Sequence, residues 1–226
     1  MCFSATASFA MGGALIPAGA YAISRARQGD GTWIAFAVYP LAFGVQQIAE
    51  GVVWLGLDGS DETLTAVASR GFMFFSHFFW LAFVPFSVRM GEPDPIRLRM
   101  LAFLGGLGAL LGLAIYLPVF VYPQSLTVEV IERSIDYSVA LNMKTEFNVG
   151  AIRLAYGAII IGALVLSSDW RIRLFGGLVG GALGVTFLFY EYALISVWCF
   201  FAAGLSAYLV VVITQDHRSA LADNSS

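Results

Sequence analysis

Polar side chains that could do chemistry occur at a few positions inside long apolar stretches of this 226-residue chain. Glu50 follows Gln46 by four residues and Gln47 by three, and His77 follows Arg70 by seven. These are helical spacings, so each set would share one face of its helix. Ionisable groups inside apolar helices are costly, and they usually pair with one another, bind a ligand or relay protons. We therefore expect these five residues to form a polar site.

The depths of these residues along their helices predict that they meet. Glu50 lies about seven residues, or 10 Å, from the end of its apolar stretch, and Arg70 lies about six residues, or 9 Å, from the start of the next. Consecutive helices run in opposite directions, so both residues approach the same side of the bundle. Arg153 and Glu191 belong to that side as well. A polar cavity that opens on this side, with Glu191 near its mouth, is the simplest explanation.

Each of these residues also has a plainer explanation. Glu50 and Arg70 could form an interhelical ion pair with a purely structural role, or Glu50 could pair with Arg153 instead. His77 has two phenylalanines within three positions on each side in the sequence. It could therefore be a packing histidine held by hydrogen bonds. Glu191 lies between two tyrosines, where an exposed turn residue is also expected.

The composition places the chain among membrane proteins. Hydrophobic residues make up 59% of it and charged residues 12%, against roughly 45–50% and 25% in soluble domains. The mean hydropathy is +0.80. A net charge of -3 with no basic tract excludes nucleic acid as a partner. The lipid bilayer is therefore the first partner that the sequence predicts.

The chain offers few residues that hold metals or cofactors. Its two cysteines and two histidines cannot make a disulfide framework or a three-histidine zinc site. A zinc or copper site from Glu50, His77, Glu191 and Cys2 is an alternative, but their spacing matches no ligand motif. The single lysine, Lys144, lies outside the apolar stretches, which excludes a retinal Schiff base. The sequence thus predicts no metal site and identifies no cofactor.

Hydropathy predicts the fold class directly. A helix needs about 20 mostly apolar residues to cross a bilayer. Seven stretches qualify, over residues 5–24, 32–57, 64–88, 100–122, 149–166, 174–189 and 193–214. The last two are expected to form a hairpin, because one helix over both would be about 60 Å long, twice the bilayer thickness. We predict an all-α, single-domain bundle of seven transmembrane helices over residues 1–226, with a short tail from about residue 215.

Two features refine this picture. The connection at about 123–148 mixes the alternation typical of a strand with an apolar stripe typical of a helix, so it could be an amphipathic segment that caps the bundle or a mobile loop. Gly108 and Gly112, four residues apart, and a similar series at Gly176, Gly180 and Gly184 favour close helix packing.

Arginines predict the orientation. Short cytoplasmic loops carry an excess of Lys and Arg. With the N-terminus outside, eight arginines fall on the cytoplasmic side, and only Arg133 and Lys144 fall in the outer loops. We therefore predict an exported N-terminus, a cytoplasmic C-terminus and a place in the plasma (inner) membrane. The first arginines follow the first apolar stretch, so we expect that stretch to be retained and not cleaved as a signal peptide.

Two motifs carry a resemblance to a known family. The opening MCFSATASF, residues 1–9, and FGVQQIAEGVVW, residues 43–54, resemble an uncharacterised prokaryotic multi-pass membrane protein family, a domain of unknown function. The likeness extends along the whole chain. The resemblance implies a shared membrane fold, and it transfers no functional residue.

The sequence alone favours one function over two others. An outward-facing polar cavity lined by Gln46, Gln47, Glu50, Arg70, His77 and Glu191 would bind and transport a small polar or ionic solute. The first alternative is a membrane-embedded, metal-assisted enzyme. The second is a structural subunit of a homo-oligomer or of a larger membrane complex.

The orientation leads to a first prediction. In a background without Cys2 and Cys199, cysteines introduced as Ser60→Cys and Ser125→Cys should react with a membrane-impermeant thiol reagent in intact cells, because both lie in predicted outer loops. Arg173→Cys should react only after the membrane is permeabilised. Labelling of the Arg173 position in intact cells would reverse the orientation.

Overall fold

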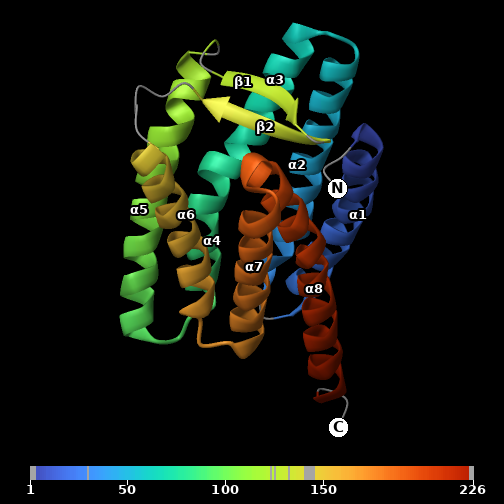
Figure 1. Cartoon of the computed structure of the whole chain (residues 1–226). Helices are drawn as coiled ribbons and strands as arrows, with labels where there is room; N and C mark the ends of the chain where they lie inside the picture. Colours follow the sequence, from blue (N-terminus) through green and yellow to red (C-terminus); the bar gives the residue numbers. More distant parts are fainter. Residues whose placement is uncertain are drawn as a thin grey trace.

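The structure is a bundle of long helices with a β-hairpin across one end (Figure 1). This computed structural model describes residues 4–29, 31–122, 124, 126–131, 133–139 and 146–223. The helices and strands follow one another in the order α1 (Ala5–Gln28), α2 (Ile34–Asp58), α3 (Glu62–Met73), η1 (Phe74–Phe79), α4 (Trp80–Met90), α5 (Pro95–Val121), β1 (Leu126–Ile131), β2 (Ser134–Val139), α6 (Glu146–Val165), α7 (Trp170–Phe189), η3 (Glu191–Ala193) and α8 (Leu194–Asp223).

The helices agree closely with the apolar stretches. Six are long and apolar enough to cross a membrane, and one of them, Glu62–Met90, joins α3, η1 and α4. The apolar part of α6, Val149–Val165, is shorter, so the seventh crossing remains a prediction. The hairpin predicted from the last two stretches is confirmed, because α7 ends at Phe189 and the turn η3 separates it from α8.

The predicted helical fold class is confirmed, with one addition, a two-stranded β-hairpin in the connection between α5 and α6. Strands β1 and β2 pair antiparallel, with Val128 opposite Tyr137 and Val130 opposite Ile135. Ile135 is fully buried, and the Tyr137 ring stacks on Phe72 of α3 with centroids 4.8 Å apart. Strand β2 also contacts α8 and η3. Of the two expectations for this connection, a segment that caps the bundle is confirmed for the described residues, and its period is that of a strand.

Helix α2 lies at the centre of the bundle. It contacts α1, α3, α4 and α8. Of its most apolar 18-residue stretch 67% is buried, against 22% of the corresponding stretch of α5. Glycines bring α1 and α2 together, since a Cβ at Gly44 would come within 3 Å of the Ile16 backbone nitrogen. Polar residues on α2 are therefore held inside the protein and away from lipid.

The predicted glycine contacts are confirmed in part. A Cβ at Gly108 would overlap the Leu81 carbonyl, and one at Gly112 would lie 3.0 Å from the His77 carbonyl oxygen, so α5 packs closely on α4 and η1. A Cβ at Gly176 would come 2.7 Å from the Leu164 side chain, whereas one at Gly184 would meet nothing within 4 Å. Close packing thus uses only part of the glycine series on α7.

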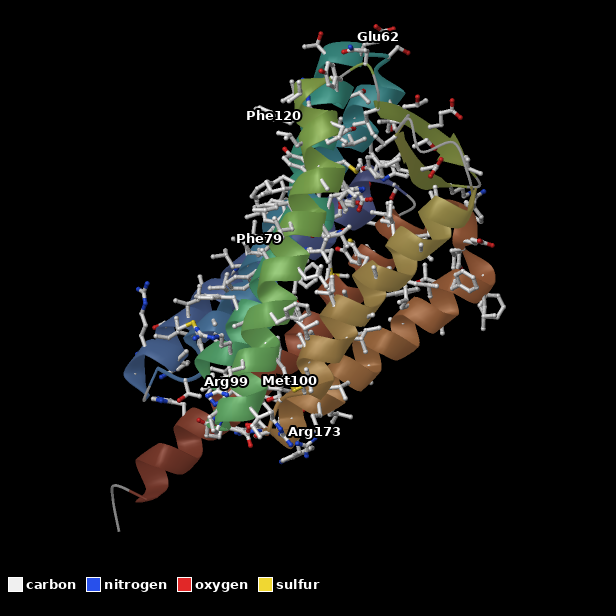
Figure 2. The ribbon with its side chains drawn as sticks, turned by 90° about the vertical axis from the view of Figure 1, so that its left-hand side faces the viewer. Glu62, Phe79, Arg99, Met100, Phe120 and Arg173 are labelled. Carbon is white, nitrogen blue, oxygen red and sulfur yellow. The ribbon has the colours of Figure 1, made fainter. Side chains whose placement is uncertain are left out.

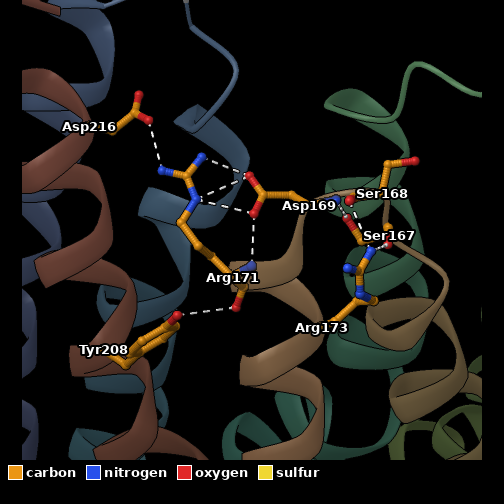
Figure 3. A network of polar contacts seen from close by, with 7 residues as sticks. All are labelled: Ser167, Ser168, Asp169, Arg171, Arg173, Tyr208 and Asp216. Atoms are coloured by element: carbon orange, nitrogen blue, oxygen red, sulfur yellow. Dashed lines mark hydrogen bonds and ion pairs between the residues drawn. The ribbon is translucent and has the colours of Figure 1, made fainter. Parts of the chain in front are cut away.

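A network of polar contacts joins the helices at the end opposite the hairpin (Figure 3). Arg171 donates to Asp169, which caps α7, and to Asp216 on α8, with Nη–Oδ distances of 2.7 and 2.8 Å. The guanidinium also lies 4.6 Å from the Trp33 ring at the start of α2. Because three helices meet at this side chain, Arg171 fixes their relative positions.

Glu92 makes a second connection at the same end. Ser168 donates to its carboxylate through the backbone nitrogen, at 2.7 Å, and through the hydroxyl, at 2.5 Å. Arg97 donates to the same hydroxyl at 2.8 Å. The α4–α5 turn and the α6–α7 turn are therefore tied together. We call this side of the bundle, with Arg99 and Arg173 (Figure 2), the arginine end, and the opposite side the hairpin end.

The close approach at Gly108 predicts a difference between neighbouring glycines. Gly108→Ala should lower the free energy of unfolding in detergent by about 1–3 kcal/mol, because the added methyl group forces α5 away from the Leu81 carbonyl. Gly106→Ala is the matched control, since a Cβ there meets nothing within 4 Å. Equal thermal stability of the two variants would show that α4 and α5 do not pack this closely.

The Arg171 network predicts a pH effect. Partial burial acts to raise the pKa of Asp169, but hydrogen bonds from Arg171 outweigh it and hold the pKa below its ordinary value. Asp169 therefore stabilises the fold above pH about 4, and this contribution is lost as the pH falls through the lowered pKa. At pH 7, Asp169→Asn should cost about 1 kcal/mol, a value reduced by partial exposure. The difference in melting temperature from the wild type should shrink in acid.

The exposed hairpin carboxylate Glu129 provides the control for this measurement. Glu129→Gln removes an acid of the same charge that makes no contact with the network, so its melting curve should follow the wild type throughout. A stability gap for Asp169→Asn that is as large in acid as at pH 7 would contradict a role for the ionised carboxylate.

Candidate functional site

His77 lies on a π-helical turn in the middle of the third span. In this turn, η1, the backbone N–H of Trp80 donates to the Phe75 carbonyl, five residues back. His77 is buried, and its Nδ1 lies 3.0 Å from the Ser76 hydroxyl. The Tyr156 hydroxyl of α6 donates to the Ser76 carbonyl. Single π-turns inside α-helices occur frequently at functional sites, so this turn is the natural starting point for a candidate site.

A cavity of about 260 Å³ lies between this turn and the hairpin. Its polar lining comes from His77, from Asp136 and Ser138 on β2, from Arg153 on α6 and from Tyr192 of η3. Ser138 is exposed at its rim, so the cavity reaches the protein surface. This cavity lies at the hairpin end and has both acidic and basic side chains in its lining. Of the six residues predicted to line a polar cavity, only His77 lines it.

Two smaller cavities continue from the first one toward the bundle centre. A cavity of about 70 Å³ shares His77, Ile152 and Arg153 with it and reaches Cys199. A third, of about 30 Å³, shares Cys199 with the second and ends among aromatic rings such as that of Trp80. Each is large enough to hold at least one water molecule. Successive cavities share lining residues and become smaller from the hairpin end inward, and we call the three the cavity series.

Gln46, Gln47 and Glu50 form a separate cluster, which is fully buried between α2 and α8. Gln47 Nε2 donates to the Glu50 carboxylate at 3.3 Å, and the Ser196 hydroxyl of α8 donates to its other oxygen at 2.5 Å. Gln46 Oε1 accepts from Trp80 Nε1 at 2.7 Å. Trp80 is therefore the contact between this cluster and the innermost cavity.

The predicted pairing of Glu50 with Arg70 is wrong. The Arg70 Nε donates to the Ala66 carbonyl one turn earlier on α3, at 2.9 Å, while Glu50 turns toward α8. The alternative pairing with Arg153 is also wrong, because Arg153 lies 3.8 Å from Glu191. The prediction considered only how deep each residue lies along its helix. The partner of a side chain also depends on the rotation of the helix about its axis, and this rotation directs Glu50 and Arg70 to different neighbours.

Glu191 lies at the turn between α7 and α8, as its position between two tyrosines suggested. Its side chain is 63% exposed and that of Arg153 is 40% exposed, so their ion pair is in contact with solvent. Exposed pairs of this kind contribute little to stability. The pair instead places an exposed acidic group beside the cavity-lining arginine.

Sequence reasoning missed several residues of the site. Tyr156 lies three residues after Arg153, and Ser196 lies three residues before Cys199, so helical spacing could have found both. Asp136 and Ser138 alternate along β2 and carried no signal before the connection was known to be a strand.

The described residues contain no group of three or more His, Cys, Asp or Glu side chains that could hold a metal ion. Glu50, His77 and Glu191, which the metal alternative combined, are not brought together, and Cys2 lies outside the described residues.

Comparisons with known proteins identify the family without adding an activity. No curated protein and no solved structure matches this chain. A family model described as a family of unknown function (DUF6629) matches residues 1–225, so the chain belongs to that family, as the resemblance of its two motifs implied.

Proposed function

We propose that the protein is an integral membrane protein that binds a small polar solute in the cavity series and passes it toward the bundle centre. The observation that carries this proposal is the sharing of lining residues between successive cavities, from the surface cavity to Cys199. A structural subunit needs no such internal path.

The size and lining of the cavity narrow the kind of solute. Pockets for drug-sized ligands run from about 300 to 1,000 Å³, so the first cavity, at about 260 Å³, suits a smaller molecule. Arg153 and His77 can donate hydrogen bonds, and Asp136 can accept them. A compact molecule with both donor and acceptor groups is the best match. In this proposal His77 and Arg153 contact the solute, and Glu191 modulates Arg153.

The buried cluster has a different role in this proposal. Gln46 fixes the indole of Trp80, and Glu50 holds α8 through Ser196. Both contacts set the walls of the inner cavities, since Trp80 lines one and Cys199 of α8 lines two. Gln46, Gln47 and Glu50 thus position the path, and the solute contacts other residues. Arg70 faces away from Glu50 and is not assigned to the solute.

The basic residues support a direction for the path. Arg99 and Arg173 lie together at the arginine end, and Glu62 lies at the opposite end (Figure 2). If the arginine end is cytoplasmic, as the positive-inside rule requires, the cavity series opens to the outside of the plasma membrane.

Cys199 offers a direct test of the path. In a Cys2→Ser background, a small charged methanethiosulfonate should modify Cys199 in membranes, because water reaches it through the cavity series. Ile152→Trp should slow this reaction at least ten-fold by filling the first and second cavities, which Ile152 lines. Leu154→Trp is the matched control, because Leu154 lies on the same helix and is 77% exposed.

The same reaction identifies the solute. Amino acids, small carboxylates, sugars and inorganic ions can each be tested for protection of Cys199, and a bound solute should protect the parent protein and the Leu154→Trp control alike. If Cys199 reacts only after unfolding, or at equal rates in both tryptophan variants, there is no path, and the structural-subunit alternative would replace this proposal.

A further inference from the structure

A second site lies on the outside of the bundle, where a groove of about 480 Å³ runs between α4 and α5. The rings of Phe79, Phe83 and Phe86 form one wall of it. These residues are spaced at i, i+4 and i+7, so they follow one face of the span. The Phe79 and Phe83 rings stack with centroids 4.8 Å apart, which gives this wall a continuous apolar surface.

Small residues on α5 leave the groove open. Ala102, Gly105 and Ala109 follow the facing side of α5 at i, i+3 and i+7. A Cβ at Gly105 would meet only the Pro85 side chain, at 3.6 Å, so helix packing does not require the glycine there. The groove is therefore a cleft between two helices whose floor could carry larger side chains.

A positive charge closes the groove at one end. Arg89 lines it and is exposed at the last turn of α4, at the arginine end. Among the described residues, no ion pair or hydrogen bond occupies the Arg89 guanidinium, whereas Arg97, Arg171 and Arg173 are engaged by neighbouring loops and helices. An anionic group would therefore complement the positive charge of Arg89 at this end of the groove.

The length of the groove matches one leaflet of a bilayer. From Phe79 to Arg89 is ten residues, or about 15 Å along a helix. Half of the hydrocarbon thickness of a bilayer is also about 15 Å. A chain that begins at the headgroup level beside Arg89 would thus reach the middle of the membrane at Phe79, which Figure 2 shows between Glu62 at one end and Arg99 at the other.

We propose that the groove between α4 and α5 binds one acyl chain of an anionic glycerophospholipid, whose phosphate pairs with Arg89. The proposal depends on α4 and α5 crossing a membrane and is independent of the cavity series. Arginine is well suited to this contact, because its planar guanidinium donates two parallel hydrogen bonds to a phosphate. If the arginine end is cytoplasmic, the lipid belongs to the inner leaflet, where basic groups meet anionic lipids.

Native mass spectrometry of the full chain in detergent tests this site with phosphatidylglycerol and phosphatidylcholine as probes. The wild type should retain one phosphatidylglycerol in preference to phosphatidylcholine. Arg89→Gln should lower the affinity for phosphatidylglycerol about five-fold, the effect of one basic residue at a membrane surface. Arg99→Gln is the control, because it removes an equal charge at the same end without touching the groove.

Filling the groove tests the acyl chain separately. Gly105→Phe should abolish retention of either lipid, whereas Gly106→Phe, one residue away on an exposed surface, should retain the wild-type lipid. If Gly105→Phe fails to fold, Ala109→Phe tests the same space, and Arg89→Gln tests the headgroup contact without altering the groove.

Three results would overturn the proposal. Equal retention of the two lipids by the wild type would show that the groove has no preference for an anionic headgroup, and unchanged retention in Arg89→Gln and Gly105→Phe would show that neither lipid binds in the groove. A dimer that is lost in Gly105→Phe, without any effect on lipid, would show that a second copy of the chain occupies the groove.

Discussion

Hydrocarbon supplies no hydrogen bonds, and this constraint explains why several polar groups of the long apolar helices bond to neighbouring helices. The π-turn at His77 breaks the regular backbone ladder, and hydroxyl groups of the adjacent helices donate to carbonyls beside the break. Tyr156 donates to Ser76, and Tyr116 donates to Arg70. The irregular turn is therefore held by α5 and α6 together. The amides and the carboxyl of α2 also lie in the interior, away from the outer surface of the bundle.

The Glu50 cluster shows how hydrogen bonds from uncharged side chains accommodate a buried carboxyl group. When two opposite charges are buried in a bundle, both lose their hydration, and their attraction often does not exceed this desolvation cost. A buried ion pair therefore often fails to stabilise the fold. Here one amide and one hydroxyl donate to the carboxyl oxygens, and the hydroxyl belongs to α8. The contact joins the most buried helix to the one that lines the inner cavities. This hydrogen bond is thus one of the contacts that join α2 to α8.

Spans were predictable from the sequence because length and hydropathy are local properties. Each of the seven apolar stretches coincides with a helical segment and extends at most two residues beyond it, and Ser4 and Asp94 cap their helices with hydrogen bonds that their side-chain chemistry favours. The partners of Glu50 and Arg70 were not predictable, because the rotation of each helix about its axis depends on packing against all neighbours at once. The hairpin was missed for a related reason: six-residue strands leave too short a pattern to separate from a helical stripe.

The third span, Glu62–Met90, lines an interior cavity on one face and the outer groove on another, and the π-turn lies between its two halves. Its inward face must direct His77 to the cavity series, and its outward face must align Phe79, Phe83 and Phe86 along the groove with α5. An extra residue within one turn rotates everything after it by about 100° relative to a regular helix. The rotation occurs between α3 and α4, so each half of the span can satisfy its own neighbours: α3 packs on α2, and α4 packs on α5 and α6. The backbone irregularity therefore allows one helical span to line both the interior cavities and the outer groove.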